Sequence, residues 1–483
     1  MTARRCIRLT LAAVVVVAAV VAAGAAAHNT SPGRWSAPQA LASITQYVSS
    51  SSLVVNQSGR AVAAWFSGRP QKVSAGSGGL VPARAFAAHG VKVFADVGSA
   101  RRGFGAPVVV ATNGDDEQGD VHAAVSGSGV AYVAWDGDSP VGWRIAVADG
   151  GRFSAPRSLG LPGGAQLIEL ASADSGPVDA VWIRYHVHAA PALYYATLRS
   201  DGSLGRTITV AHLGSPLTQI EFALDDRGAV VASWVLGPQG LNPARPRALT
   251  RVRAVLCTGG GSCGSPQTLP LGPVRPQLVN TATTLSDNGT ATVLAGGEEE
   301  AVLDGGNVPT EIGPHGLWAA ISRDGDRFRA TPEISPTGNF PLAAAAGTGG
   351  AVAIFNVGAP PIDTIAWSGL TNAAAGFTPA QEIPDHETIS YQALAANRAG
   401  AFVAAWLDND RSADARNSLH AAIGSSGRLQ APQTIAPTAD PPAQESLAAG
   451  IDGHGNAIVL WSEYGADGYT HGVFVSFARP MTP

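Results

Sequence analysis

The chain has 483 residues, of which 45% are hydrophobic and 14% are charged, so it can bury a large core. Its 58 glycines and 33 prolines punctuate short apolar runs and do not gather in one tract, which favours an all-β protein over a disordered one. The net charge is -5 and the only lysines are Lys72 and Lys92, which excludes nucleic-acid binding through phosphate neutralisation.

Residues 1–27 have the pattern of a secretory signal. Arg4, Arg5 and Arg8 precede an apolar run over 9–23, and Gly24 to Ala27 supply the small residues that a signal peptidase needs. We predict cleavage near Ala27 and a secreted domain over 28–483, with 28 basic and 36 acidic residues. An uncleaved membrane anchor is the alternative, because residues 9–27 approach the roughly 20 residues that span a bilayer. The export route, Sec or twin-arginine, stays open.

From there the chain repeats one frame, a glycine followed six residues later by tryptophan with an apolar run between them. Two further copies keep the spacing and lose the indole. The copies are Gly59 to Trp65, Gly129 to Trp135, Gly176 to Trp182, Gly228 to Trp234, Gly289 to Ala295, Gly349 to Phe355, Gly400 to Trp406 and Gly455 to Trp461. A second motif, glycine and an aromatic residue before proline, alternates with the first and begins at Gly33 to Pro38. Each unit therefore predicts four strands, A to D.

The last unit lacks its strand D, and an unassigned strand precedes the first unit. Strands are expected at Ser446 to Ile451, Asn456 to Trp461 and His471 to Phe477, while Gly33 to Leu41 has no unit of its own. A β-propeller resolves both facts, because its ring closes when the N-terminal strand joins the C-terminal blade. We predict one propeller of eight four-stranded blades. Seven blades is the alternative, if the unit at Gly289 to Ala295 is an insertion.

The strand B segments are apolar on both faces, as expected for strands between neighbouring sheets. We therefore interpret their tryptophans as core residues. The A-to-B and C-to-D turns are tight, as at Asp225 to Gly228, whereas the B-to-C loops are long, as at Phe66 to Gly90 and Gly296 to Gly316. One face of the ring is thus predicted to carry short turns, and the other long loops.

Cys257 and Cys263 flank Thr-Gly-Gly-Gly-Ser. A close pair in an exported chain most simply forms a disulfide that clamps a hairpin turn, so we predict this bond.

At the C-to-D turns the chain resembles sialidase-like propellers, whose Asp-box reads roughly Ser-x-Asp-x-Gly-x-Thr-Trp. Ser322-Arg323-Asp324-Gly325-Asp326-Arg327-Phe328 is a shortened form of it. The resemblance spans about Gly33 to Ala478 and implies a propeller fold and, in that family, glycoside hydrolysis. No catalytic residue is assigned by a motif, so whether the chain is an enzyme stays open.

Several polar groups fall on the predicted loop face. Asp115 to Asp120 with His122, and Glu298 to Glu300, are interpreted as solvated loops. His186 and His188 have a chelating spacing, and Asp408 to Arg411 could hold calcium, but neither supplies a full ligand set, so we expect no cofactor and no metal, with calcium as an open alternative. The candidate ligand-binding residues are Tyr185, His186, Glu298, Asp410, Arg411, Tyr464 and Tyr469.

The favoured function is a secreted, monomeric binding propeller whose loop face binds an extracellular glycan or protein. The alternative is a sialidase-like glycoside hydrolase or lyase that acts on extracellular glycans. A carboxylate pair at the mouth of the ring would favour the enzyme.

Overall fold

The computed structural model is an all-β ring with no helix in its described residues. These residues are 33–72, 86–112, 120–137, 142–172, 176–186, 189–214, 217–237, 251–271, 278–298, 316–323, 325, 327–346, 350–359, 362–370, 376–383, 389–408, 418–425, 428–437, 447–464 and 471–480. The predicted signal at 1–27 lies outside them. Within these ranges no helix is long and apolar enough to cross a membrane.

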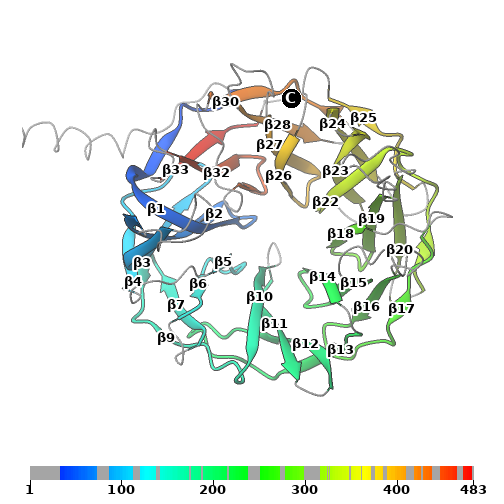
Figure 1. Ribbon diagram of the computed structural model, residues 1–483, viewed down its shortest axis with the longest axis horizontal. Coiled ribbons are helices and arrows are strands. Elements are labelled where there is room, and N and C mark those ends of the chain that lie inside the picture. Colours follow the sequence, from blue (N-terminus) through cyan, green and yellow to red (C-terminus); the bar gives the residue numbers. More distant parts are fainter. Residues whose placement is uncertain are drawn as a thin grey trace, which may run out of the picture.

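Eight antiparallel blades surround a central axis (Figure 1). Blade 1 consists of β1 (Gln39–Val55), β2 (Arg60–Lys72), β3 (Phe86–Ser99) and β4 (Val108–Thr112), and blade 2 of β5 (Val121–Val125), β6 (Ala131–Trp135), β7 (Arg144–Asp149), β8 (Arg152–Phe153) and β9 (Arg157–Ser158). Blade 3 consists of β10 (Ala165–Ser172), β11 (Val178–His186), β12 (Ala189–Thr197) and β13 (Ile208–His212), and blade 4 of β14 (Leu217–Leu224), β15 (Val230–Leu236), β16 (Arg251–Cys257) and β17 (Gln267–Thr268).

Blades 5 to 8 follow the same order. Blade 5 consists of β18 (Leu278–Leu285), β19 (Ala291–Glu298), β20 (Gly316–Ser322) and β21 (Arg329–Ala330), and blade 6 of β22 (Gly338–Ala346), β23 (Gly350–Ala359), β24 (Ile362–Leu370) and β25 (Gln381–Glu382). Blade 7 consists of β26 (Ile389–Ala396), β27 (Ala401–Asp408), β28 (Ser418–Ser425), β29 (Arg428–Leu429) and β30 (Gln433–Pro437), and blade 8 of β31 (Ala448–Ile451), β32 (Ala457–Tyr464) and β33 (His471–Ala478). The unit at Gly289 to Ala295 forms blade 5, so the eight-blade prediction is confirmed and the seven-blade alternative is wrong.

The ring closes through β1, as predicted. Its first part pairs with β33, at Gln39 with Val475 and Ala40 with Phe474, and Trp35 bridges Ala478. Its second part pairs with β2 from Tyr47 to Val55. One strand therefore serves as strand D of blade 8 and strand A of blade 1, which joins the two blades into a seven-stranded sheet. The edge of β33 is covered, and an exposed edge of this kind would otherwise pair with another chain.

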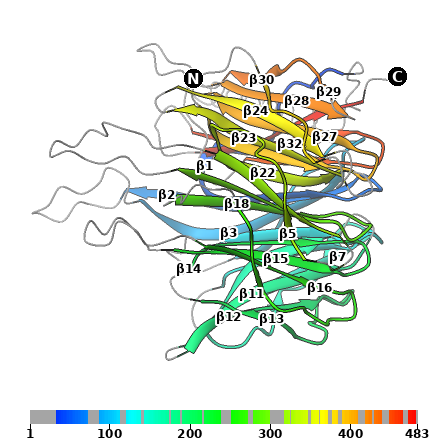
Figure 2. The same ribbon diagram turned by 90° about the vertical axis from the view of Figure 1, so that its right-hand side faces the viewer.

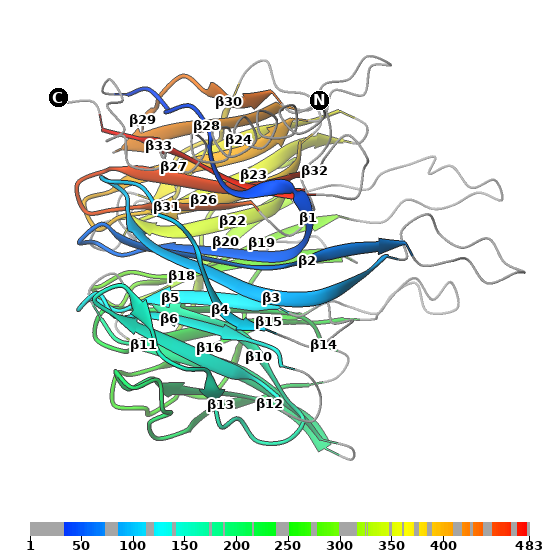
Figure 3. The ribbon, with the colours of Figure 1, turned by 90° about the vertical axis from the view of Figure 1, so that its left-hand side faces the viewer.

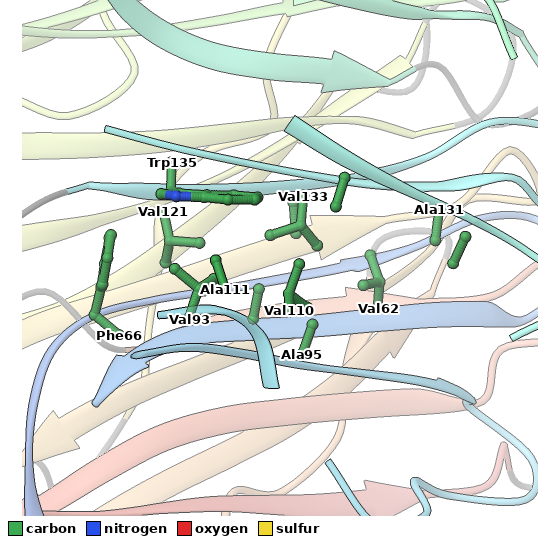
Figure 4. Packing of buried hydrophobic residues seen from close by; sticks show 14 of the residues in the cluster. Val62, Phe66, Val93, Ala95, Val110, Ala111, Val121, Ala131, Val133 and Trp135 are labelled. Carbon is green, nitrogen blue, oxygen red and sulfur yellow. The ribbon is translucent and has the colours of Figure 1, made fainter. Parts of the chain in front are cut away.

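The core lies between the blades. Trp65, Trp135, Trp182, Trp234, Trp406 and Trp461 are all at most 1% exposed, which confirms them as core residues. Figure 4 shows one such layer, in which Val62, Phe66 and Val93 of blade 1 face Val133 and Trp135 of blade 2. Small alanines let the sheets approach, and the indoles fill the space between them.

We call the face with the A-to-B and C-to-D turns the turn face, and the opposite face the loop face. In the turn before β15, Oδ1 of Asp225 accepts hydrogen bonds from the amides of Arg227 and Ala229 at 2.9 and 2.8 Å. Asp452 makes the same pair of bonds before β32, to His454 and Asn456 at 2.9 and 2.8 Å. Gly228 and Gly455 adopt positive φ angles of 74° and 83°, which explains why glycine recurs there.

Two other sequence predictions can be compared with the fold. Cys257 and Cys263 form a disulfide that closes the C-to-D turn of blade 4, as predicted. The predicted B-to-C loop from Phe66 to Gly90 is wrong in extent, because β2 continues to Lys72 and β3 begins at Phe86. Backbone pairing across these two strands outweighed the glycine and proline signals that suggested a loop.

Candidate ligand-binding site on the inner strands

Four of the seven candidate residues lie where strands B reach the loop face. Tyr185 and His186 end β11, Glu298 ends β19 and Tyr464 lies at the end of β32. Tyr185 is 57% exposed, as a ligand-binding side chain would need to be. Asp410, Arg411 and Tyr469, and also His188, lie outside the described residues. The convergence of these side chains on one ligand therefore stays a prediction.

The polar groups that the structure brings together belong to strands A, the innermost strand of each blade (Figure 1). Glu169 lies on β10 of blade 3 and Glu221 on β14 of blade 4, and both are half-buried. Burial and, to a smaller extent, the neighbouring Glu221 carboxylate together raise the pKa of Glu169 to about 8. Burial also raises the pKa of Glu221, to about 7. Two carboxyl groups on adjacent inner strands thus titrate near neutral pH.

Gln219 fixes the second of these carboxyl groups. Its Nε2 donates to Oε1 of Glu221 at 2.8 Å and to the carbonyl oxygen of Thr281, on blade 5, at 3.0 Å. Its Oε1 accepts from the amide of Thr281 at 3.0 Å. The Gln219 amide is therefore held by two blades, and its hydrogen bond opposes the rise in the pKa of Glu221. Sequence reasoning missed this group, because the three residues are scattered singly along apolar strands.

Other inner strands are linked in the same way. The hydroxyl oxygens of Ser50 and Ser52 on β1 accept hydrogen bonds from the amides of Val121 and Ala123 on β5, at 3.3 and 3.1 Å. The two serine hydroxyls thus satisfy backbone N–H groups between the inner strands of blades 1 and 2. Gln392 on β26, the inner strand of blade 7, donates to the side chain of Asn356 on β23, strand B of blade 6.

His122 corrects the interpretation of the acidic segment of blade 2. We expected it in a solvated loop, but it lies half-buried on β5, with its ring centroid 5.4 Å from that of Trp143. Burial lowers its pKa to about 4, and Asp120 partly opposes this shift. The ring is therefore neutral at neutral pH. Among the described residues no group of three or more His, Cys, Asp or Glu side chains could hold a metal ion.

An ion-pair cluster ties blades together on the turn face. Nε of Arg398, in the A-to-B turn of blade 7, lies 2.8 Å from Oδ2 of Asp287 in blade 5, and its Nη1 lies 3.4 Å from Oδ2 of Asp226 in blade 4. The carboxylates of Asp226 and Asp287 in these turns are thus held by an ion pair within the ring.

No protein-family model matches the chain, and no curated protein sequence matches it. Solved structures do resemble it. A protein of unknown function from Dyadobacter fermentans is 11% identical with a TM-score of 0.41, over 93% of this chain and 100% of that chain. The Hadza microbial sialidase Hz136 is 11% identical with a TM-score of 0.38, over 92% and 95%.

The N11 neuraminidase-like protein of a flat-faced bat strain (H18N11) is 9% identical with a TM-score of 0.40, over 84% of this chain and 97% of that chain. Sialidase-like propellers are thus among its structural neighbours, at low identity. These matches concern the architecture and assign no activity to this chain.

Proposed function

We propose that the protein is a secreted, monomeric propeller that binds an extracellular glycan at its inner strands, approached from the loop face. The observation that carries this proposal is the group formed by Glu169, Gln219 and Glu221 on blades 3 and 4. Sugar hydroxyls both donate and accept hydrogen bonds. A carboxyl group that titrates near neutral pH can donate a hydrogen bond to a hydroxyl when it is protonated and accept one when it is ionised. Both glutamates are half-buried, which leaves part of each side chain within reach of a ligand.

Secretion is supported by the arginines and apolar run of residues 1–27 and by the Cys257–Cys263 disulfide. Disulfides persist in oxidising compartments and are rare in the cytosol. The loop-face residues, Tyr185 among them, would add contacts around the inner-strand group.

The test is a glycan array probed with the protein from residue 28 onward. We expect a hit whose signal falls at least about tenfold in Glu169→Gln and in Glu221→Gln, because each change removes a carboxyl group that can pair with a hydroxyl. Asp149→Asn is the matched control, since it removes an exposed carboxylate from the turn face. A hit that both inner-strand variants retain in full would contradict the assignment of the site. An array without any hit would favour a protein ligand.

A glycoside hydrolase or lyase is the second candidate function, and the carboxyl pair is what favours it. Glycosidases pair a protonated carboxyl group with an ionised one, and the pKa values of Glu169 and Glu221, about 8 and 7, would divide the two roles in that order. A panel of fluorogenic glycosides tests this candidate. Turnover that both glutamine variants abolish would identify an enzyme, whereas binding without turnover on every substrate supports the binding protein.

A further inference from the structure

The inner strands of the ring carry charge of one sign. Strands A of the eight blades contain two acidic residues, Glu169 and Glu221, and no lysine or arginine. His122 on β5 is neutral at neutral pH, because burial lowers its pKa to about 4. The other polar residues of these strands are Ser, Thr, Asn, Gln and Tyr. A ligand at the inner strands therefore meets two carboxyl groups and no cation from the same strands.

These two carboxyl groups belong to neighbouring blades. β10 of blade 3 lies beside β14 of blade 4, and β14 lies beside β18 of blade 5. Figures 2 and 3 show the blades crossing the ring between the turn face and the loop face. Glu169 and Glu221 are close enough for their charges to interact, and neither forms an ion pair with a residue that the structure describes. Like charges repel, so a bound cation would relieve this repulsion.

Strand register places Glu221 and Thr281 in one space between blades 4 and 5. Directly paired residues of antiparallel strands point to the same side of a sheet. Glu221 pairs with Ser233, whose hydroxyl lies 2.6 Å from that of Thr283 on blade 5. Thr281 pairs with Ala295, which packs in the core between blades 4 and 5. The side chains of Glu221 and Thr281 therefore face each other's blade.

The hydrogen-bonding positions left open in this group are mainly acceptors. Nε2 of Gln219 already donates to Glu221 and to the carbonyl oxygen of Thr281. Oε2 of Glu221 and both oxygens of Glu169 accept no hydrogen bond from a described residue. The Thr281 side chain is 3% exposed, and its Oγ1 has no hydrogen-bond partner within the described part of the chain. Because a buried polar atom without a partner lowers stability, a ligand that donates a hydrogen bond here would be favoured.

We propose that this inner-strand group selects a glycan with free amino groups, such as an oligomer of glucosamine, whose ammonium group binds the carboxylates of Glu169 and Glu221. This inference rests on the proposed function and names the ligand class of the same site. An ammonium group has donors and no acceptor, and its positive charge compensates the carboxylates. Sugar hydroxyls match the hydroxyl and amide side chains of the inner strands. A sugar carboxylate is disfavoured, because it would add a further negative charge.

The probe is a fully deacetylated glucosamine hexamer. The matched ligand is the N-acetylglucosamine hexamer, which has the same backbone and no positive charge. Both are titrated by calorimetry into the protein from residue 28 onward, at about pH 6.5, where a primary amine is mostly protonated. We expect the glucosamine hexamer to bind at least about tenfold more tightly at low salt. The difference should shrink between about 50 and about 300 mM NaCl, because salt screens the charges that the solvent reaches.

Four variants test the residues. Glu169→Gln and Glu221→Gln should each weaken binding of the glucosamine hexamer by at least about tenfold. Thr281→Val removes the unpartnered hydroxyl and keeps the backbone bonds to Gln219, so it should weaken binding about threefold without lowering the melting temperature. Thr283→Val is its matched control on the same strand. Its hydroxyl is already bonded to that of Ser233, so this change should lower the melting temperature and alter binding less than about twofold.

Equal binding of the two hexamers, or tighter binding of polygalacturonate, overturns the selection of free amines. If both glutamine variants lose that neutral or acidic ligand, the proposed function stands and this inference alone fails. Equally tight binding of a lysine hexamer also overturns it, because the site would then not require a glycan. Full retention of the glucosamine hexamer by both glutamine variants contradicts the site itself. Circular dichroism shows whether each variant is folded.

Discussion

At the residue scale, the tryptophans of strands B show how one residue type can define an architecture. Each fills the space between two sheets, and the indole N–H groups of Trp65, Trp135 and Trp182 have no hydrogen-bond partner among the described residues. Trp461 differs, because its Nε1 donates to Oε1 of Glu463 at 2.8 Å. A buried donor without a partner lowers stability, so these side chains are retained for their volume.

Trp234→Ala should therefore lower the free energy of unfolding by about 3–5 kcal/mol, since it removes the whole ring from a site with 0% exposure. Chemical denaturation followed by circular dichroism measures this loss. Tyr185→Ala is the control, because Tyr185 is 57% exposed and its loss should change stability by less than about 0.5 kcal/mol. Similar losses in the two variants would show that the indole is not a core residue.

The raised pKa of Glu169, about 8, predicts how stability depends on pH. Between its ordinary value of 4.5 and the folded value, the folded protein binds a proton that the unfolded chain has lost. This contribution is full below pH 4.5 and is lost as pH rises towards 8. For a half-buried group, we expect a loss of about 1–2 kcal/mol. The fall in melting temperature from pH 5 to 8 should be shallower in Glu169→Gln, and an identical slope would contradict the shift.

At the element scale, the frame that begins with glycine predicted strand B of every blade, with tryptophan at its end in six copies and Ala295 or Phe355 in the other two. Turns with a positive φ angle, as at Gly228, favour glycine, and the space between the sheets favours a large apolar side chain. Strand extent was less predictable. The segment from Ser67 to Lys72 contains glycine and proline, yet it pairs with β3, because a bulge absorbs the irregularity. Contacts between residues far apart in sequence decided this, and no local pattern records them.

The disulfide at the turn of blade 4 gives a prediction at this scale. Cys257 and Cys263 should not react with iodoacetamide in the native protein, and both should react after reduction. Replacing both by serine should lower stability by about 2 kcal/mol, the value expected for closing a loop this short. Mass spectrometry after alkylation reports the first result and thermal denaturation the second. Rapid labelling without reductant would exclude the bond.

At the scale of the whole molecule, the ring and its blade count followed from counting motifs and from the unassigned strand at the N-terminus. The candidate site at the inner strands could not be predicted from the motifs. Glu169, Gln219 and Glu221 come from two blades, and only ring geometry brings them together.

Closure of the ring gives the last prediction. Residues 33–42 contribute Trp35, which bridges Ala478, and the pairs that Gln39, Ala40 and Ala42 make with β33. A chain that begins at residue 43 would leave most of the β33 edge uncovered. Such an edge pairs readily with other chains, so we expect a lower melting temperature and concentration-dependent association in light scattering. A chain that begins at residue 33 is the control and should remain monomeric. Adding the peptide of residues 33–42 in excess should restore part of the lost stability, since it can reoccupy the vacant edge. Equal stability and equal size of the two chains would show that the N-terminal strand does not hold the ring closed.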